Sequence, residues 1–309
     1  MHSIFLRKIP LLLSTALTVC IFTFFLIHTA PGDRLDSYLG QEGAPPAERD
    51  LIRQQLGLDE GVVTQFFCYM GRLSSGDLGS IPGKGNVASI LFRRFLATAR
   101  LALAAIVLSV IVGLTAGLAS GWYANTRFDR VVQLIMIFCV STPIFWFGLV
   151  MLAIFAWALN LFPAAGSDGP AYLVLPALTL GLRPAALIAR VARANTIDTK
   201  GETFVLAAKA RGISLPVLLF KHILKVVSIP VVTIVGMDFA SLLSGAVITE
   251  TVFSYQGLGL FAIEAISNRW YDAVMAVALV WAGIFILANF VVDLSYAVLD
   301  PRTRGGQSA

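Results

Sequence analysis

Charged side chains are scarce in this sequence of 309 residues, because aspartate, glutamate, lysine and arginine together make up 13% of it. Hydrophobic residues reach 57%, and the mean hydropathy is +0.81. A soluble domain covers its surface with polar groups, and this composition does not supply enough of them. The low charge content therefore excludes an ordinary soluble domain and predicts an integral membrane protein.

Cysteine and histidine are equally rare, with three residues of each. Cys20 and Cys139 lie inside apolar runs, and Cys68 stands alone in a polar segment. This spacing provides neither a disulfide framework nor a CxxC metal site, and the histidines are too scattered for a metal cluster. The sequence also lacks the phosphate-binding pattern G-x-x-x-x-G-K-S/T. We therefore expect no metal, no bound cofactor and no catalytic residue in this chain.

Basic residues outnumber acidic ones, which gives a formal net charge of +5. In a membrane protein such residues gather in cytoplasmic loops, so nucleic acid is not an expected partner. The basic clusters at the N-terminus, in the short loops and in the C-terminal tail alternate with apolar runs in such a way that these clusters fall on one side of the membrane. They are Arg7 and Lys8, Arg127 and Arg130, the run from Arg190 to Lys225, and Arg302 and Arg304. Both termini are therefore predicted to be cytoplasmic.

Six apolar segments are long enough to cross a bilayer, whose core of about 30 Å requires roughly 20 helical residues. They are residues 9–30, 98–123, 131–159, 172–189, 226–248 and 272–298. The first segment follows two basic residues, as a signal peptide does, but its length favours an uncleaved anchor. The sequence thus predicts an all-α membrane protein with six transmembrane helices.

The polar segment at residues 31–97 is predicted to lie outside the cell membrane. It contains PPAERDLIRQQLGL at residues 45–58, which is typical of a short amphipathic helix. Such a helix fits either a packed cap over the membrane domain or part of a docking surface for an external partner.

Small and helix-breaking residues mark positions inside the apolar segments. Gly113, Gly117 and Gly121 recur at every fourth residue, which predicts a helix face that another helix approaches closely. Pro143 and Pro176 interrupt backbone hydrogen bonding in two other segments. Each proline fits either a static kink or a gating hinge.

Two charges fall inside predicted spans, Arg183 in the fourth and Asp238 in the fifth. A charge at mid-bilayer costs on the order of 3 kcal/mol unless it faces protein or water. We therefore expect both side chains to point inward and to line a permeation route, and they are close enough in depth to pair. A purely structural ion pair is the alternative.

The loop at residues 201–230 combines basic residues with two short helical patterns. Residues 202–211 favour a helix, Gly212 favours a turn, and residues 215–227 favour a second helix that ends at Pro230. Ala207, Ala208 and Ala210 would let a partner surface approach the first helix. The alternative is an interfacial helix that lies on anionic lipid.

This loop resembles the EAA loop of ATP-binding-cassette importer permeases, in which two alanines, three residues and a glycine are followed by a proline. Here these residues are Ala207, Ala208, Gly212 and Pro230. The whole chain resembles the dipeptide, oligopeptide and nickel permease family, permease B type. The matching segments are HTAPGD at 28–33, RQQLGLD at 53–59, GDLG at 76–79, STPIFWFG at 141–148, LPALTLG at 175–181, ITETVFSYQGLG at 248–259 and VVDLSYAVLDPRTR at 291–304.

The resemblance implies the type I importer permease fold in a bacterial inner membrane. Its parts would be a first helix at 1–30, a periplasmic insert at 31–97, a five-helix domain at 98–300 with a coupling loop at 190–226, and a cytoplasmic tail at 301–309. The implied partners are a second permease subunit, two ATPase subunits that bind ATP and magnesium, and an extracytoplasmic solute-binding protein. Short peptides are the first expected substrate, with nickel chelates, glutathione and opine-type conjugates as alternatives.

The implied site residues fall into two sets. The cytoplasmic coupling helix would contact an ATPase through Glu202, Phe204, Ala207, Ala208, Ala210, Arg211 and Gly212. The translocation route would include Arg183, Asp238, Ser141, Pro143 and Glu250. A secondary carrier is the competing class, but it needs its own coupling-ion site, and no inverted internal repeat is apparent. A receptor or scaffold without transport activity is a third class.

Overall fold

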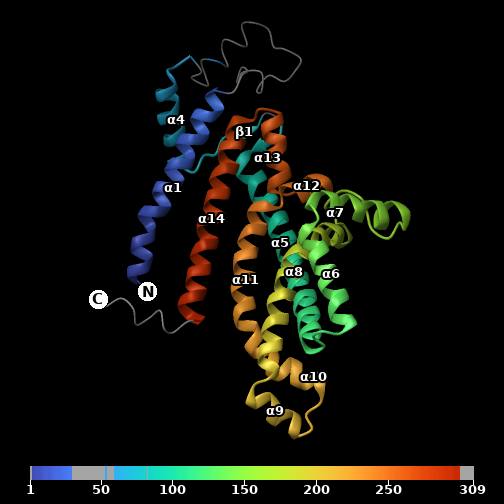
Figure 1. Ribbon diagram of the computed structural model, residues 1–309. Helices are drawn as coiled ribbons and strands as arrows, with labels where there is room; N and C mark the ends of the chain where they lie inside the picture. The colour runs from blue at the N-terminus through green and yellow to red at the C-terminus, as the bar shows by residue number, and fades with distance from the viewer. Residues whose placement is uncertain (1, 30–52, 54–58, 82, 300–309) are drawn as a thin grey trace. The chain divides into compact units, whose positions relative to one another are not determined.

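The structure is a computed structural model that describes residues 2–29, 53, 59–81 and 83–299 (Figure 1). The described elements are helices apart from one short hairpin, which confirms the all-α class. In chain order they are α1 (His2–Thr29), α4 (Val62–Ser74), β1 (Ser80–Ile81), β2 (Gly85–Asn86), α5 (Val87–Trp122), α6 (Arg127–Ser141), α7 (Ile144–Met151), the π-helix η1 (Leu152–Ala158), α8 (Pro170–Lys200), α9 (Thr203–Ala210), α10 (Leu215–Val217), the π-helix η2 (Leu218–Ile223), α11 (Leu224–Gly245), α12 (Val247–Val252), α13 (Leu258–Ser267) and α14 (Tyr271–Leu299). The helix expected at residues 45–58 lies outside the described residues, apart from Arg53.

The chain divides into two compact units, and unit 1 comprises residues 1–97 and 257–286. A small core in this unit joins Phe24 of α1, Tyr69 of α4 and Met275 of α14. The strands β1 and β2 pair antiparallel, with Ser80 opposite Asn86. Unit 1 therefore holds the first and last helices together through aromatic packing.

Unit 2 comprises residues 98–256 and 287–309 and contains the functional candidates. Its central element is α8, which packs against α6 and α11. The helices α9, α10 and η2 follow α8 at one end of the unit and connect it to α11 (Figure 1). The short helices α9, α10 and η2 thus form a connection between the long helices α8 and α11.

The glycines of α5 lie directly against α8. A Cβ added to any of the three would meet α8 at a separation that real Cβ atoms do not show. The added Cβ would lie 2.8 Å from the Ile188 Cβ at position 113, 2.6 Å from the Ala192 Cβ at position 117 and 2.6 Å from the Thr196 Cβ at position 121. The two helices approach closely because these positions carry no side chain.

Three helical stretches of the described residues are long and apolar enough to cross a membrane: α5, α8 and residues Leu215–Leu243. A fourth is added if α6 and residues Ile144–Ala158 count as one broken span. Both α5 and α8 extend beyond the predicted spans 98–123 and 172–189. The structure therefore establishes a membrane protein with several spans.

The predicted span at residues 131–159 is not one straight helix, because α6 and the helix at Ile144–Ala158 meet at an angle of 110°. Thr142 and Pro143 between them are both extended, with ψ of 131° and 135°. A proline disfavours the helical conformation for the residue before it, and its nitrogen donates no hydrogen bond. Pro143 therefore turns the chain sharply instead of producing a mild kink.

The predicted helix end at Pro230 is also wrong. Pro230 lies inside α11, which continues to Gly245. A proline removes one backbone hydrogen bond, whereas a helix end in an apolar environment leaves several backbone groups unpaired. Continuing the helix is therefore the less costly arrangement.

Candidate functional site

The helix α9 begins three residues after α8 ends, and a glycine turns the chain after its C-terminus. Glu202 stands at its N-terminus with extended backbone, and its carbonyl accepts from the Val205 and Leu206 amides at 3.0 and 3.1 Å. At the other end Gly212 has φ +75°, and the Ile213 amide donates to the Ala208 carbonyl at 3.3 Å. This left-handed glycine ends the helix and directs the chain toward α10.

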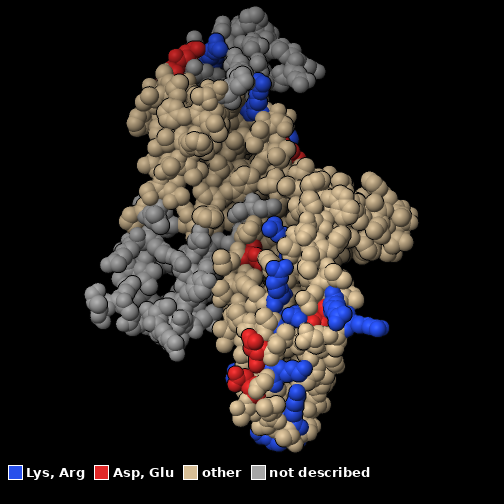
Figure 2. All heavy atoms as spheres, viewed as in Figure 1, with Lys and Arg blue, Asp and Glu red and all other residues tan. Residues whose placement is uncertain are grey.

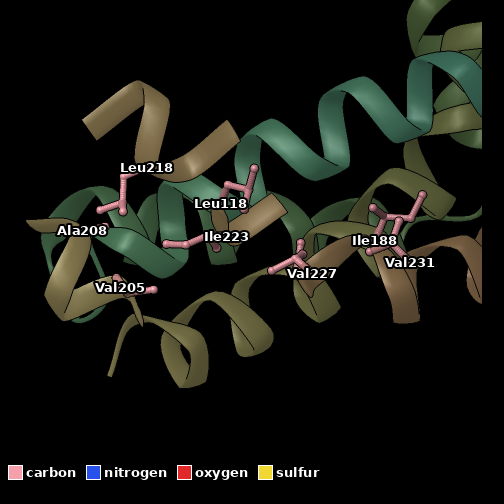
Figure 3. Close-up of a cluster of buried hydrophobic side chains, with 9 residues drawn as sticks. Leu118, Ile188, Val205, Ala208, Leu218, Ile223, Val227 and Val231 are labelled. Carbon is pink, nitrogen blue, oxygen red and sulfur yellow. The ribbon is translucent and has the colours of Figure 1, made fainter. Parts of the chain in front are cut away.

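One face of α9 is anchored in the core of unit 2. Val205 is 0% exposed and Ala208 is 3% exposed. Figure 3 shows both side chains in a cluster with Leu118, Ile188, Leu218, Ile223, Val227 and Val231. Ala208, which the sequence placed among the docking residues, therefore contacts the protein's own core.

The remaining surface of α9, which we call its open face, carries exposed side chains. Phe204 is 43% exposed and Leu206 is 53% exposed, although both are large apolar side chains. Among the other expected docking residues, Ala207 is half-buried, and the exposed ones are Glu202, Ala210, Arg211 and Gly212. A short helix with a buried face and an exposed apolar face presents a suitable surface to a partner.

Two lysines tie this region to the end of α5. The Lys200 Nζ donates to the Trp122 carbonyl at 2.7 Å and lies 5.0 Å from the centre of its ring. The Lys209 Nζ of α9 lies 4.4 Å from the same ring. Each ammonium group is attracted to the electron-rich ring face. Sequence reasoning used these lysines only to orient the chain and missed this contact.

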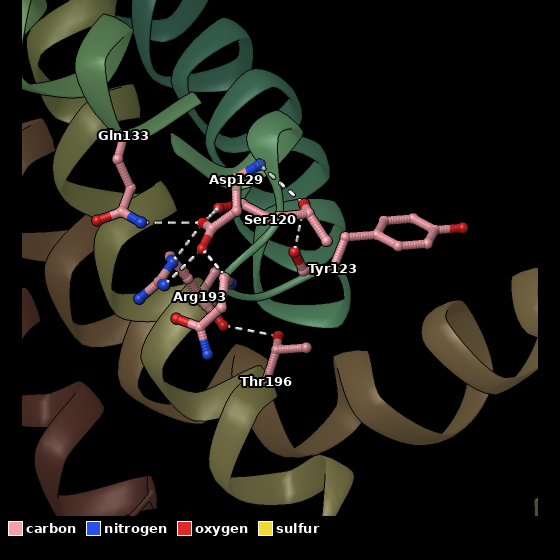
Figure 4. A network of polar contacts seen from close by, with 9 residues as sticks. Ser120, Tyr123, Asp129, Gln133, Arg193 and Thr196 are labelled. Carbon is pink, nitrogen blue, oxygen red and sulfur yellow. Dashed lines mark hydrogen bonds and ion pairs between the residues drawn. The ribbon is translucent and has the colours of Figure 1, made fainter. Parts of the chain in front are cut away.

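A buried carboxylate joins α5, α6 and α8 in the network of Figure 4. Asp129 is 1% exposed, and Arg193 donates to its two oxygens at 2.7 and 2.8 Å. The Ser120 hydroxyl, the Asn125 amide and the Gln133 side chain also donate to it. The bidentate geometry is the strong form of this ion pair, and it satisfies the buried charge.

Sequence reasoning missed Asp129, although one local signal was present. Thr126 precedes α6, and its hydroxyl accepts from the Asp129 amide at 3.3 Å. A threonine followed three residues later by an acidic residue is typical of a helix start. That signal locates the helix but does not reveal the arginine 64 positions away.

The residues expected along a translocation route lie in different environments. Arg183 is exposed on α8, and Asp238 is half-buried on α11. Their charges interact electrostatically, but they form no ion pair in the part of the chain that the structure describes. The Asp238 Oδ2 is buried without a hydrogen-bond partner among the described residues. Ser141 and Pro143 are exposed beside the 110° bend.

Glu250 lies inside unit 2 and not at its surface. It is 0% exposed, and its Oε1 accepts from the Thr98 hydroxyl at 2.6 Å. The Tyr255 amide donates to its carbonyl at 2.8 Å. Burial, and then the Glu250 charge, raise the pKa of Tyr255 above its usual value. Glu250 therefore fixes the turn after α12.

A groove of about 1100 Å³ runs along α5 next to the start of α8. Its wall is apolar, with Leu103, Val107 and Ile111 on one helical stripe, and Arg100 and Asp168 add charge. None of the five expected route residues lines this groove. No group of three or more histidine, cysteine, aspartate or glutamate side chains suited to a metal occurs among the described residues.

Two family models together match nearly the entire chain. The model described as "Binding-protein-dependent transport system inner membrane component" matches residues 109–305. Its N-terminal companion matches residues 1–102.

Curated relatives match over the same extent. The dipeptide transport system permease protein DppB of Alkalihalophilus pseudofirmus is 34% identical, over 97% of this chain and 98% of the relative. The glutathione transport system permease protein GsiC of Escherichia coli K12 is 34% identical, with the same two coverages of 97% and 98%. The di/tripeptide transport system permease protein DppB of Pseudomonas aeruginosa is 34% identical, over 98% of this chain and 99% of the relative.

Solved structures show a similar fold. An inward-facing structure of the MetNI methionine ABC transporter has a TM-score of 0.56 at 18% identity, and covers 69% of this chain and 97% of that chain. An amino acid ABC transporter crystallised with histidines has a TM-score of 0.52 at 16% identity, with coverages of 67% and 92%. The chain therefore belongs to the family of binding-protein-dependent transport system inner membrane components, the permease subunits of ATP-binding-cassette importers.

Proposed function

We propose that this permease subunit carries short peptides across the bacterial inner membrane, as half of a translocation pathway completed by a second permease. The named relatives transport dipeptides, di- and tripeptides or glutathione, and each of these substrates consists of a few amino acids joined by amide bonds. An external solute-binding protein selects the substrate, because specificity is set where the ligand is held. Nickel chelates and opine-type conjugates are the less favoured substrates.

In this proposal, six helices span the membrane, both termini are cytoplasmic, and residues 31–97 lie in the periplasm. The bent pair α6 and α7 and the helices α1 and α14 complete the set of six. The support is the apolar character of the described parts of α1 and α14, and the basic residues in the short connections after α5 and α8. The alternation of spans then places α9 in the cytoplasm.

Two ATPase subunits drive the transporter, and this chain neither binds nor hydrolyses ATP. The observation that carries the proposal is the division of α9 into a buried face and an open apolar face. Val205 and Ala208 attach the helix to the core, so a force applied at Phe204 is passed to α5 and α8. The ATPase subunits bind the open face of α9, and their closure on ATP moves the membrane helices.

Arg183 and Asp238 are proposed to face the passing substrate. A zwitterionic peptide carries one charge of each sign, so an exposed guanidinium and a carboxylate with an unpaired oxygen complement it. Replacing Arg183 and Asp238 one at a time with leucine should slow peptide uptake in vesicles. Unchanged uptake in both variants would assign the two charges a purely structural role.

The coupling proposal is tested by placing a charge on the open face of α9. Phe204→Glu should reduce recovery of the ATPase subunits with the purified permease and abolish peptide-stimulated ATP hydrolysis. Phe220→Glu is the matched control, because Phe220 is 56% exposed on η2, outside α9. Normal coupling in the Phe204→Glu transporter, or an equal loss in both variants, would contradict the assignment of α9.

A further inference from the structure

A hollow of about 270 Å³ lies between α5, α6 and α8, and none of the individually named coupling or translocation residues lines it. Its apolar wall includes Val132, Met136 and Ile137 of α6. Its polar lining includes Gln133 of α6, together with Arg190 and Arg193 of α8. The hollow therefore combines hydrocarbon and cationic surface in one small space.

The two arginines differ in how their charges are compensated. Arg193 is neutralised by the bidentate pair with Asp129. The remaining acceptor positions of Asp129 receive donors from Ser120, Gln133 and the Asn125 backbone. Arg190 is exposed, and no residue in the described part of the chain pairs with it. The hollow thus retains one uncompensated positive charge.

A second cation flanks the hollow on α6. Arg130 lies three residues before Gln133 and seven before Ile137, so these three side chains share a helical stripe. It is exposed and has no ion-pair partner within the described residues. Figure 2 shows lysine and arginine side chains gathered over the ends of α6 and α8. The entrance to the hollow is therefore basic on both helices.

Apolar surface continues outward from the hollow along α6. Leu134, Ile135 and Phe138 are 66%, 52% and 52% exposed. In a membrane-spanning protein, surface of this kind meets acyl chains. Basic side chains next to such surface, near the end of a membrane helix, attract anionic headgroups.

We propose that this hollow binds an anionic phospholipid, with the phosphate held by Arg190 and Arg130 and an acyl chain lying on Val132, Met136 and Ile137. A phosphate compensates both charges while they stay at the level of the headgroups. A second protein subunit over the same surface would bury two unpaired cations, which carries a large desolvation cost. The lipid then stabilises the contact between α6 and α8, together with the buried Asp129–Arg193 pair beside it.

The test is lipid titration of the full-length permease, purified in an uncharged detergent and observed by native mass spectrometry. Phosphatidylglycerol and phosphatidylcholine with identical acyl chains are compared. Phosphatidylglycerol should bind more tightly, and Arg190→Gln should weaken its binding by roughly fivefold while leaving phosphatidylcholine unchanged. Arg190→Lys should keep most of the preference, which guards against a general folding defect in the glutamine variant.

Lys221→Gln is the matched control, because it removes one exposed positive charge from η2, outside α6 and α8. Lys221 does not line the hollow. We expect wild-type lipid binding in this variant. Equal affinity for the two lipids, equal losses in the Lys221 and Arg190 variants, or cross-linking of Ile137→Cys to a second permease subunit in place of lipid would each overturn the proposal.

Discussion

In unit 2, α8 and the bent pair of α6 and α7 both contain helix-breaking residues, yet they respond differently. The helix α8 continues through Pro176 and Pro184, whereas the chain turns by 110° at Pro143. The hydroxyl of Ser109 on α5 donates to the Gly181 carbonyl of α8 at 2.6 Å, within one turn of Pro184. A neighbouring helix thus supports the α8 backbone close to one of its prolines.

The described residues enclose the α7 segment less completely. Phe145, Trp146 and Leu149 are 50%, 44% and 49% exposed. The surroundings of α8 therefore fix its shape, and α8 can pass a movement of α9 to the rest of unit 2. The surface of α7 is left for lipid or a partner to cover. Substitutions in the two regions should therefore differ sharply in their effect on the stability of the protein.

The largest expected effect comes from filling the contact between α5 and α8. A Cβ at position 117 would lie 2.6 Å from both the Ala189 carbonyl oxygen and the Ala192 Cβ. Gly117→Leu should therefore separate the helices and prevent recovery of folded protein in size-exclusion chromatography. Gly283→Leu is the control, since nothing lies within 4 Å of a Cβ there. A folded Gly117→Leu protein with wild-type stability would show that the two helices are not tightly joined.

The next effect comes from leaving Asp129 without its partner. Arg193→Met should lower the free energy of unfolding by about 3 kcal/mol, because a buried charge loses its compensation. The double variant Arg193→Met with Asp129→Leu should recover most of this loss in thermal unfolding. Lys225→Met, an exposed change on α11, serves as the control. A double variant no more stable than the single one would rule out an uncompensated carboxylate as the cause.

Loosening α9 from the core should cost less. Val205→Ala removes two buried methyl groups and should cost about 2 kcal/mol. Hydrogen exchange of the α9 amides should accelerate accordingly. Leu206→Ala, on the exposed face of the same helix, should leave exchange nearly unchanged. If Leu206→Ala accelerates exchange more than Val205→Ala does, the two faces of α9 have been assigned the wrong way round.

A smaller effect is expected at the Trp122 ring. Lys209→Met removes one ammonium group above the ring and should cost about 0.5–1 kcal/mol. The same thermal unfolding assay measures it, with Lys221→Met as an exposed control. A cost equal to that of the control would mean that this contact adds nothing to the attachment of α9.

The smallest effect is expected in α7. Trp146→Ala should change the free energy of unfolding in detergent by less than about 0.5 kcal/mol, because an exposed side chain loses few contacts. A loss of several kcal/mol would show that α7 is enclosed as tightly as α8, and the contrast between the regions would disappear.

Much of the fold could be predicted because long apolar runs and regular glycine spacing depend only on local sequence. The start of α5 could not, since Arg93, Arg94 and Arg100 interrupt the apolar run while the helix extends back to Val87. Hydropathy marks the membrane-embedded part of a helix and not the helix itself. The sequence shows a break at Pro143 but not its angle of 110°, because that angle depends on how α6 and α7 pack against α8.

The short helix α9 and the turn after it were predictable from the sequence, but their internal contacts were not. Gly212 indicated the turn, and the spacing of small residues indicated α9. The inward orientation of Ala208 and the Trp122 contacts required the path of α5 and η2 beside α9. The partner of Asp129 lies far along the chain, so only the folded structure identifies Arg193.

The central claim is that an ATPase subunit binds the open face of α9. Cys68 is the exposed native cysteine of the described part, so it is first replaced by serine. Phe204→Cys and Phe145→Cys are then each treated with a short thiol cross-linker in the assembled transporter. The account predicts a cross-link from position 204 to an ATPase subunit and none from position 145. Cross-linking from position 145 alone, or labelling of position 204 from outside the cell, would contradict it.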